Sequence, residues 1–305
     1  MKGNTVRELA AKGVDRLRRA GVESPRLDAE LLLAKVLDKD RHFLHVNPDY
    51  CPDVGVEAEY YALLNRRAAG EPLQYLTGIQ EFMGLVFTVN PSVLIPRSDT
   101  ETLVEEVLDR LKGYRGMGVS ETPETPGSGM DGDRVLGLDL GTGSGAIAVS
   151  LACYFAGLYV KAVDISPEAL RVAQKNAVRH GVADRIDFLR GDLFSPFEGT
   201  GQKFDLIVSN PPYISGKEMR ELQREVLHEP QSALYGGSDG LCFYKKIVAG
   251  APEFLKRGGL LAVEIGYDQA AAVIDLLNQT GVFKYTEVVK DLAGRCRVVL
   301  AAAHN

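Results

Sequence analysis

Strand-like and helix-like segments alternate from residue 134 to the end of the chain, and this alternation is the strongest constraint on the fold. Apolar, β-branched stretches predict strands, and apolar residues at helical spacing between most of them predict helices. The predicted strands cover residues 134–139, 158–163, 185–189, 204–209, 259–265, 283–289 and 296–301, and the helices cover 144–155, 167–180, 241–256 and 268–279. This alternation is typical of a doubly wound α/β domain with a mainly parallel sheet.

The connection between the last two predicted strands is unusually short. Only the segment Lys290–Arg295 joins them. A parallel crossover needs about a dozen residues or more, whereas an antiparallel pair can be joined by a short turn. We therefore predict that the last of the seven strands runs antiparallel to the rest of the sheet.

The residues that precede the α/β domain predict a small helical bundle and a linker. Thr5 and Glu8 form a capping box, Ser24-Pro25 opens a second helix, and two further helices are predicted near 40–46 and 54–69. The predicted domains are a helical domain at 1–76, a β-hairpin linker at 77–92 and an α/β domain at 93–305. Residues 113–133, rich in Gly, Ser, Thr, Pro and acidic residues, predict a flexible insertion within the last of these.

Composition excludes several classes of function. The net charge is −6, and the first 80 residues hold 12 basic and 12 acidic residues, so the negative charge lies in the α/β part. Stable binding of long nucleic acid is therefore not expected. Four scattered cysteines without a C-x-x-C pair favour a reducing cytoplasm, and no zinc spacing or other metal site is predicted. No signal peptide or membrane span is expected.

A glycine-rich turn follows the first strand of the α/β domain. Gly141, Thr142, Gly143, Ser144 and Gly145 stand between that strand and the next predicted helix. Glycines allow a sharp turn and let a ligand approach backbone N–H groups at a helix N-terminus. The same residues also satisfy the dinucleotide pattern Gly-x-Gly-x-x-Ala, so the turn alone does not identify the ligand. A turn that binds no ligand and has only a structural role is another interpretation of these glycines.

Acidic residues end the next two strands. Asp164 ends the second strand, where a carboxylate can accept hydrogen bonds from both ribose hydroxyls of a nucleoside. Asp192, followed by Leu193, comes after the third strand and is placed to reach an adenine edge. Because the carboxyl ends of parallel strands meet at one edge of a sheet, the turn and the two acids predict a nucleoside-binding site there.

Two prolines stop the fourth strand abruptly. Asn210, Pro211, Pro212 and Tyr213 follow the apolar strand residues 204–209. The turn offers two hydrogen-bond acceptors, the Asn210 side-chain oxygen and the Pro211 carbonyl, and the Tyr213 ring to stack on a planar group. That combination suits a planar –NH₂ group, either of a carboxamide or of an adenine. A proline-rich surface turn without a ligand is the alternative interpretation.

Together these motifs resemble class I S-adenosylmethionine-dependent methyltransferases, which have a Rossmann-like seven-stranded sheet with the last strand antiparallel. Further segments resemble the HemK/PrmC family, the glutamine N5-methyltransferases of class I peptide chain release factors. They are Ser24–Glu30, Glu81–Leu85, Leu94–Arg97, Glu229–Leu241 and Asp291–Arg295. The resemblance covers nearly the whole chain apart from residues 113–133.

The resemblance implies roles for individual residues. S-adenosyl-L-methionine, converted to S-adenosyl-L-homocysteine, would be held by Gly141–Gly145, Asp164, Asp192, Leu193 and Asn210, with no metal. Leu193 stands where the family often has an aromatic residue, and Cys296 where an acidic residue is common. Catalysis is expected from Asn210, Pro211 and Tyr213, and substrate binding from these three with Pro212 and Arg97. Arg97 is either a cation that faces the ligand or the partner of a nearby carboxylate.

Two other functions share part of this pattern. Adenine N6-methyltransferases of DNA have the same Asn-Pro-Pro-Tyr turn, but they need base flipping and a cationic track along the backbone. The acidic α/β part has no obvious track of this kind. An NAD-dependent oxidoreductase could use the glycine turn and Asp164, but it leaves the turn at 210–213 without a role. The function that the resemblance to the HemK/PrmC family implies, glutamine methylation of a release factor, is the prediction.

Overall fold

The computed structural model describes residues 3–115 and 134–304, which form two compact units. The first comprises residues up to Ile79 together with Leu222–His228, and the second comprises Gln80–Glu221 and the residues from Glu229 onward. The sequence did not indicate that residues 222–228 belong with the helical unit. The predicted insertion at 113–133 lies outside the described residues from 116 onward, and residues 113–115 still belong to a helix. No helix of the described residues is long and apolar enough to cross a membrane.

The helical unit contains four of the helices that the sequence predicts and one that it missed. They are α1 (Val6–Arg19), α2 (Pro25–Leu37), α3 (Arg41–Val46), α4 (Val54–Ala68) and the additional α5 (Leu73–Thr77). The predicted capping box is present, because Thr5 and Glu8 bond each other's backbone N–H groups. Leucines of α1, α2 and α4 pack around the fully buried Tyr60. The unit thus has an apolar core of its own.

A buried ion-pair group ties residues 222–228 to this unit. Arg67 of α4 donates to Asp28 of α2 at 2.6 Å and to Glu225 at 2.6 Å. Burial raises the pKa of Asp28, and the hydrogen bond and charge of Arg67 act in the opposite direction. The guanidinium therefore offsets the cost of burying the Asp28 carboxylate.

The second unit contains the predicted seven-stranded sheet. Its strands are β3 (Val135–Leu140), β4 (Leu158–Asp164), β5 (Ile186–Arg190), β6 (Phe204–Ser209), β7 (Leu255–Glu264), β8 (Phe283–Lys290) and β9 (Cys296–Ala303), in the order β5-β4-β3-β6-β7-β9-β8. The predicted reversal of the last strand is confirmed, because β9 pairs antiparallel with both β7 and β8. In space β9 lies between these two strands, and β8 forms the edge.

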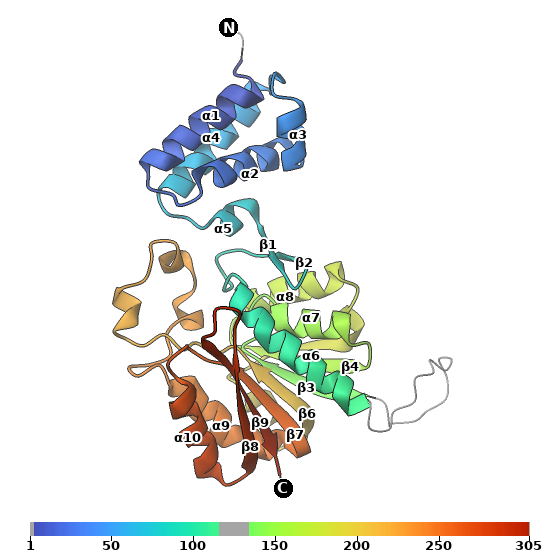
Figure 1. The fold of residues 1–305 in the computed structure, drawn as a ribbon. Coiled ribbons are helices and arrows are strands. Elements are labelled where there is room, and N and C mark those ends of the chain that lie inside the picture. Colours follow the sequence, from blue (N-terminus) through green and yellow to red (C-terminus); the bar gives the residue numbers. More distant parts are fainter. Residues whose placement is uncertain (1–2, 116–133, 305) are drawn as a thin grey trace, which may run out of the picture. The chain divides into compact units, whose positions relative to one another are not determined.

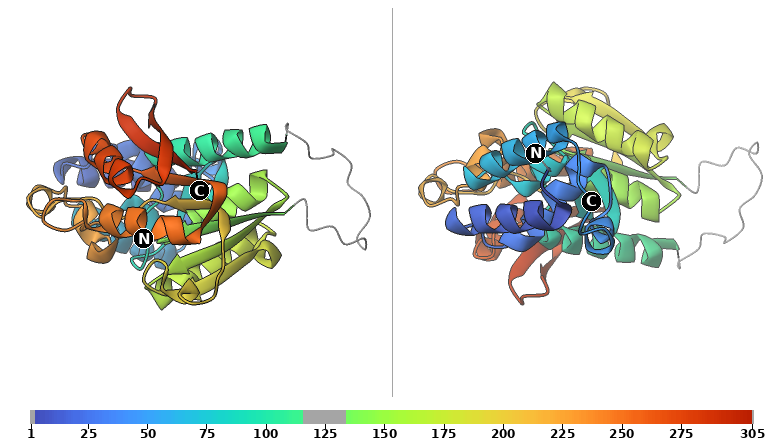
Figure 2. Two further views of the ribbon diagram at one scale, coloured as in Figure 1. Left: turned by 90° about the horizontal axis from the view of Figure 1, so that it is seen from below. Right: turned by 90° about the horizontal axis from the view of Figure 1, so that it is seen from above.

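Helices cover both faces of the sheet (Figures 1 and 2). One apolar cluster joins one face to α6 (Glu101–Arg115), α7 (Ala146–Tyr154) and α8 (Pro167–Arg179). The other cluster joins the opposite face to α9 (Cys242–Phe254) and α10 (Ala270–Thr280). Because the central strands are buried on both faces, their residues are almost continuously apolar, which explains the strong strand signal in the sequence.

A β-hairpin precedes the sheet in the chain. Its strands β1 (Ile79–Phe82) and β2 (Leu85–Thr88) are joined by Met83 and Gly84, which have φ of 52° and 67°. Two positive φ values are typical of the tight type I′ turn. The fully buried Asn176 of α8 bonds both the N–H and the carbonyl of Thr88. The hairpin end is thereby fixed to the α/β domain.

Gly145 is required where α7 approaches α8. A Cβ atom at this position would lie 3.0 Å from the Cβ of Ala173, and the backbone φ is +80°. We expect Gly145→Ala to lower the free energy of unfolding by about 2–4 kcal/mol, because steric overpacking adds to the strain of a left-handed residue. Gly281→Ala is the matched control, since Gly281 has φ +67° but open space around it. Denaturant unfolding of both variants checks this, and equal losses would contradict the packing role.

Candidate active site

The carboxyl ends of β3, β4, β5 and β6 open into one cavity of about 900 Å³. Six of the residues that the sequence predicts for cofactor binding line it: Gly141, Gly143, Asp164, Asp192, Leu193 and Asn210. Pro211 and Pro212 line it as well. The structure therefore gathers residues from the ends of four strands, β3, β4, β5 and β6, that lie far apart in the chain. The remaining predicted residues, Thr142, Ser144, Gly145, Tyr213 and Arg97, do not line the cavity.

The glycine turn faces the cavity with bare backbone. A Cβ atom on Gly141 or Gly143 would meet no protein atom closer than 4.0 Å, so both positions border open space. Thr142 and Ser144 are buried beneath the turn, and the Thr142 hydroxyl donates to Asp139 at 2.7 Å. Burial raises the pKa of Asp139 to about 7, against the effect of that hydrogen bond. These buried side chains hold the glycine turn in its conformation.

Most N–H groups of the turn are bonded within the protein. The N–H groups of Gly141 and Thr142 donate to the Val163 carbonyl at 2.8 and 2.9 Å, and that of Gly143 donates to Asp164 at 2.8 Å. The sequence-based expectation was that a ligand would approach free N–H groups here. A pyrophosphate would need such donors, because dinucleotides are held by the N–H groups of this turn. The geometry thus disfavours the dinucleotide interpretation.

Asp164 is held rigidly at the end of β4. Its Oδ2 accepts from Gly143 N and its Oδ1 accepts from Ser166 N at 2.9 Å. Burial raises its pKa, while these backbone hydrogen bonds lower it. Each carboxylate oxygen keeps a further lone pair, so a diol at the cavity wall can still donate to both. Ile165, exposed beside it, offers an apolar surface that the sequence did not reveal.

The Asp192-Leu193 pair forms another part of the wall. Leu193 has φ +49°, and its side chain packs against the core beneath α9. Asp192 is exposed and forms an ion pair with Lys246 of α9 at 3.4 Å. Lys246 and its neighbour Phe243 also line the cavity, although the sequence alone gave no signal for them.

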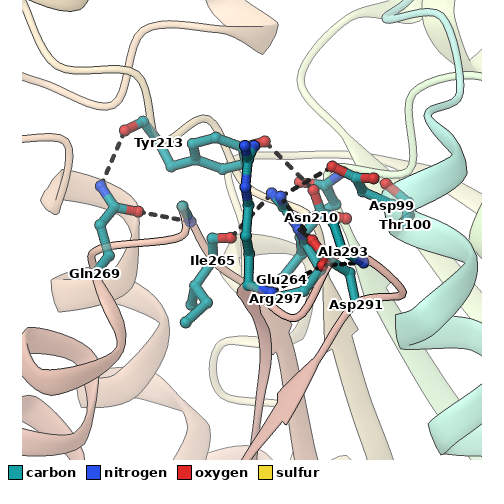
Figure 3. Close-up of polar contacts among 12 residues, drawn as sticks. Asp99, Thr100, Asn210, Tyr213, Glu264, Ile265, Gln269, Asp291, Ala293 and Arg297 are labelled. Atoms are coloured by element: carbon teal, nitrogen blue, oxygen red, sulfur yellow. Dashed lines mark hydrogen bonds and ion pairs between the residues drawn. The ribbon is translucent and has the colours of Figure 1, made fainter.

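Asn210 lines the cavity with its carboxamide anchored from behind. Its Nδ2 donates to the hydroxyl of Thr100 at 3.0 Å (Figure 3). Thr100 is buried and stands immediately before α6. An amide whose NH₂ group is used in this way leaves its oxygen as the group available to a ligand. Thr100 was not among the residues that the sequence predicted.

Tyr213 and Arg97 are directed to buried carboxylates. The Tyr213 hydroxyl lies 3.4 Å from Oε1 of Glu264, and burial raises its pKa (Figure 3). Arg97 forms an ion pair with Glu229, whose side chain is buried and also accepts from Ile95 N at 3.1 Å. Of the two interpretations of Arg97, the structure shows the second, in which Arg97 is the ion-pair partner of a nearby carboxylate. Contact of either residue with a substrate remains a prediction.

A loop that the sequence assigned no chemistry closes the other side of the cavity. Its lining residues include Gly216, Met219, Arg220, Tyr235 and the segment 230–233, and Ser92–Leu94 contribute from the loop after β2. The segments Leu94–Arg97 and Glu229–Leu241 carried part of the family resemblance. That resemblance was the only signal for this wall, because the loop has no regular period.

Comparisons with known proteins test the family assignment. A family model described as PrmC N-terminal domain matches residues 8–78, and one described as methyltransferase small domain matches residues 130–242. The chain is 44% identical over 299 residues to a release factor glutamine methyltransferase of Moorella thermoacetica, covering 97% of this chain and 98% of that protein. The chain belongs to the release factor glutamine methyltransferase family. A family member from Geobacter sulfurreducens is 46% identical over 87% of the chain and 85% of its own length.

Solved structures agree with this family's fold at much lower identity. The hMettl16 catalytic domain, crystallised in complex with the MAT2A 3'UTR hairpin 1, superposes with a TM-score of 0.55 at 16% identity. The match covers 89% of this chain and 90% of the hMettl16 chain. At such identity the likeness shows the methyltransferase fold alone. It confirms the predicted class I, Rossmann-like sheet.

Proposed function

We propose that this protein methylates the side-chain amide nitrogen (N5) of the glutamine in the Gly-Gly-Gln motif of class I peptide chain release factors. The observation that carries the proposal is that Asn210 lines the same cavity as Gly141, Gly143 and Asp164. A hydrogen-bond acceptor for an amide thus borders the space that suits a nucleoside cofactor. The relatives named above support the choice of a release factor as the partner and the cytoplasm as the location.

The cavity fits S-adenosyl-L-methionine as the cofactor. Gly141 and Gly143 leave room for close approach, and Asp164 presents two carboxylate oxygens to ribose hydroxyls. Asp192 and Leu193 line the same cavity, and we propose that they face the adenine. When bound, S-adenosyl-L-methionine supplies the methyl group. The same walls would hold the product, S-adenosyl-L-homocysteine, and no metal ion is part of the proposal.

Residues 210–213 compensate for the weak nucleophilicity of the substrate amide nitrogen. An amide nitrogen delocalises its lone pair into the carbonyl group and attacks weakly. Oδ1 of Asn210 and the carbonyl of Pro211 accept the two N–H bonds of the substrate, which fixes the face that the nitrogen presents. The same oxygens stabilise the positive charge that develops on the nitrogen. Pro212 keeps the turn rigid, and the Tyr213 ring, which lies beside the residues that line the cavity, is proposed to stack on the amide plane.

The helical domain at 1–76 is proposed to bind the release factor away from the modified glutamine, with 77–92 as linker and 93–305 as the catalytic domain. The match to the PrmC N-terminal domain at 8–78 supports this division. The apolar core of the helical domain is separate from the two apolar clusters of the α/β domain. Deletion of residues 1–75 should raise the KM for the release factor far more than the Kd for the cofactor. Loss of cofactor binding in a folded truncation would contradict this division of roles.

The function is tested by methyl transfer from labelled S-adenosyl-L-methionine to a purified class I release factor. A parallel reaction uses a release factor whose Gly-Gly-Gln glutamine is replaced by alanine. Label in the first protein and none in the second is the expected result. Label in neither, with cofactor binding intact, would overturn the substrate, and adenine in DNA would be tested next.

A further inference from the structure

A cluster of buried polar side chains lies behind Asn210, outside the residues that line the cavity. Glu264, at the end of β7, is 1% exposed, and Thr100 is 4% exposed. Tyr213 lies 3.4 Å from Oε1 of Glu264, and Arg297 of β9 is also buried (Figure 3). A carboxyl group is costly to bury, so its position beneath the turn requires a physical explanation.

Thr100 connects this cluster to the turn through its hydroxyl, which is bonded to Asn210. Its hydroxyl has one proton to donate and lone pairs to accept with. Burial raises the pKa of Glu264 to about 7, while the nearby Thr100 hydroxyl, the charge of Arg297 and the Tyr213 hydroxyl lower it. Among the described residues, Oε2 of Glu264 has no hydrogen-bond partner. The Thr100 hydroxyl accepts from Nδ2 of Asn210 at 3.0 Å, and this contact orients the carboxamide.

We propose that Thr100 is a positioning residue that sets the orientation of the Asn210 carboxamide, and through it the preference of the site for an amide over a carboxylate. The proposal rests on the proposed function and assigns the origin of its selectivity. With Nδ2 held by Thr100, Oδ1 is presented to the cavity and accepts from a substrate –NH₂ group. A glutamate carboxylate at the same place would meet an acceptor instead of a donor, and the mismatch disfavours it.

Ion pairs around Arg297 hold the segment that carries Thr100 in place. Arg297 pairs with Asp99 at 2.9 Å and with Asp291 at 3.1 Å, and it donates to the Ile265 carbonyl at 3.4 Å. Asp99 is the neighbour of Thr100, so the cation also fixes the segment that carries the hydroxyl. The Tyr213 hydroxyl joins the turn itself to the Glu264 carboxylate. Thr100 bonds Asn210 directly, and the ion pair of Asp99 with Arg297 anchors the segment that carries Thr100.

The first experiment compares Thr100→Val, which keeps the shape but removes the hydroxyl, with Thr100→Ser, which keeps the hydroxyl. Assays at pH 8 use the full chain, S-adenosyl-L-methionine and a class I release factor. We expect kcat to fall about tenfold or more in Thr100→Val, because Nδ2 of Asn210 loses its acceptor in the productive orientation. The KM for the release factor should change less than about threefold, and Thr100→Ser should restore kcat to within about threefold of the original protein.

The second experiment measures selectivity by binding, without turnover. Release factors with Gln or Glu in the Gly-Gly-Gln motif are titrated into enzyme saturated with S-adenosyl-L-homocysteine. The original protein should bind the Gln form about tenfold or more tightly than the Glu form, the discrimination of one well-placed hydrogen bond. In Thr100→Val the amide is free to turn its NH₂ group to the carboxylate, so this ratio should shrink to below about threefold. A loss of packing alone would not change the ratio.

The outcomes separate this inference from the proposed function. If the original protein labels no release factor, the function fails, and the inference fails with it. If it labels the release factor and Thr100→Val keeps the original kcat and binding ratio, only the inference is overturned. Equal loss of kcat in the Val and Ser variants would also overturn it, because packing and not the hydroxyl would then matter. If Thr100→Val does not fold, Thr100→Ala takes its place with the same expected results.

Discussion

Replacement of Asn210 by alanine should reduce methyl transfer to the release factor by a factor of about 10²–10³. This is the loss expected when one preorganised dipole that stabilises developing charge is removed from an active site. Asn210 lines the cavity, and its anchored Nδ2 leaves Oδ1 available to the substrate. The alanine variant can neither hold the amide nitrogen nor stabilise its positive charge. Single-turnover assays with labelled cofactor measure the effect on the chemical step directly.

Two controls make the result on Asn210 interpretable. Binding of S-adenosyl-L-homocysteine, measured by calorimetry, should weaken no more than several-fold, since the glycine turn and Asp164 are intact in this variant. Asn278→Ala, on an exposed position of α10, removes the same side chain far from the cavity and should leave turnover unchanged. Near-normal turnover in folded Asn210→Ala would refute the proposed role of the turn.

Replacement of Asp164 by alanine should raise the Kd for S-adenosyl-L-methionine about 100-fold. A carboxylate that accepts from two ribose hydroxyls makes two charge-assisted hydrogen bonds, and losing a net of about 3 kcal/mol corresponds to a factor of about 100. The effect includes loosening of the glycine turn, because Asp164 also accepts from the N–H groups of Gly143 and Ser166. Calorimetric titration of the cofactor gives the change in Kd.

The matched comparison for Asp164 is Asp192→Ala in the wall of the same cavity. Asp192 is exposed and pairs with Lys246, so its loss should weaken cofactor binding by less than about tenfold. Thermal unfolding of both variants without cofactor shows whether the fold is retained. Cofactor affinity in folded Asp164→Ala within threefold of the original would rule out the proposed contact with the ribose.

The sequence by itself determined the order and type of most elements. Strands buried on both faces must be apolar throughout, and helices on a sheet must carry an apolar stripe, so both leave a local signal. The short Lys290–Arg295 connection alone required the reversal of β9, which the structure confirms. The residues at 141–145, 164 and 210–213 were identifiable because glycine, proline and a carboxylate at a strand end each have a local chemical reason to be there.

The tertiary structure decided the features that depend on contacts between distant segments. It places β9 between β7 and β8, brings residues 222–228 to the helical unit, and uses the N–H groups of Gly141–Gly143 internally. It also brings Thr100 to Asn210 across 110 positions. A threonine before a helix has no special pattern in the sequence. Its role arises only when folding buries its hydroxyl beside the Asn210 amide, where each donor must find an acceptor.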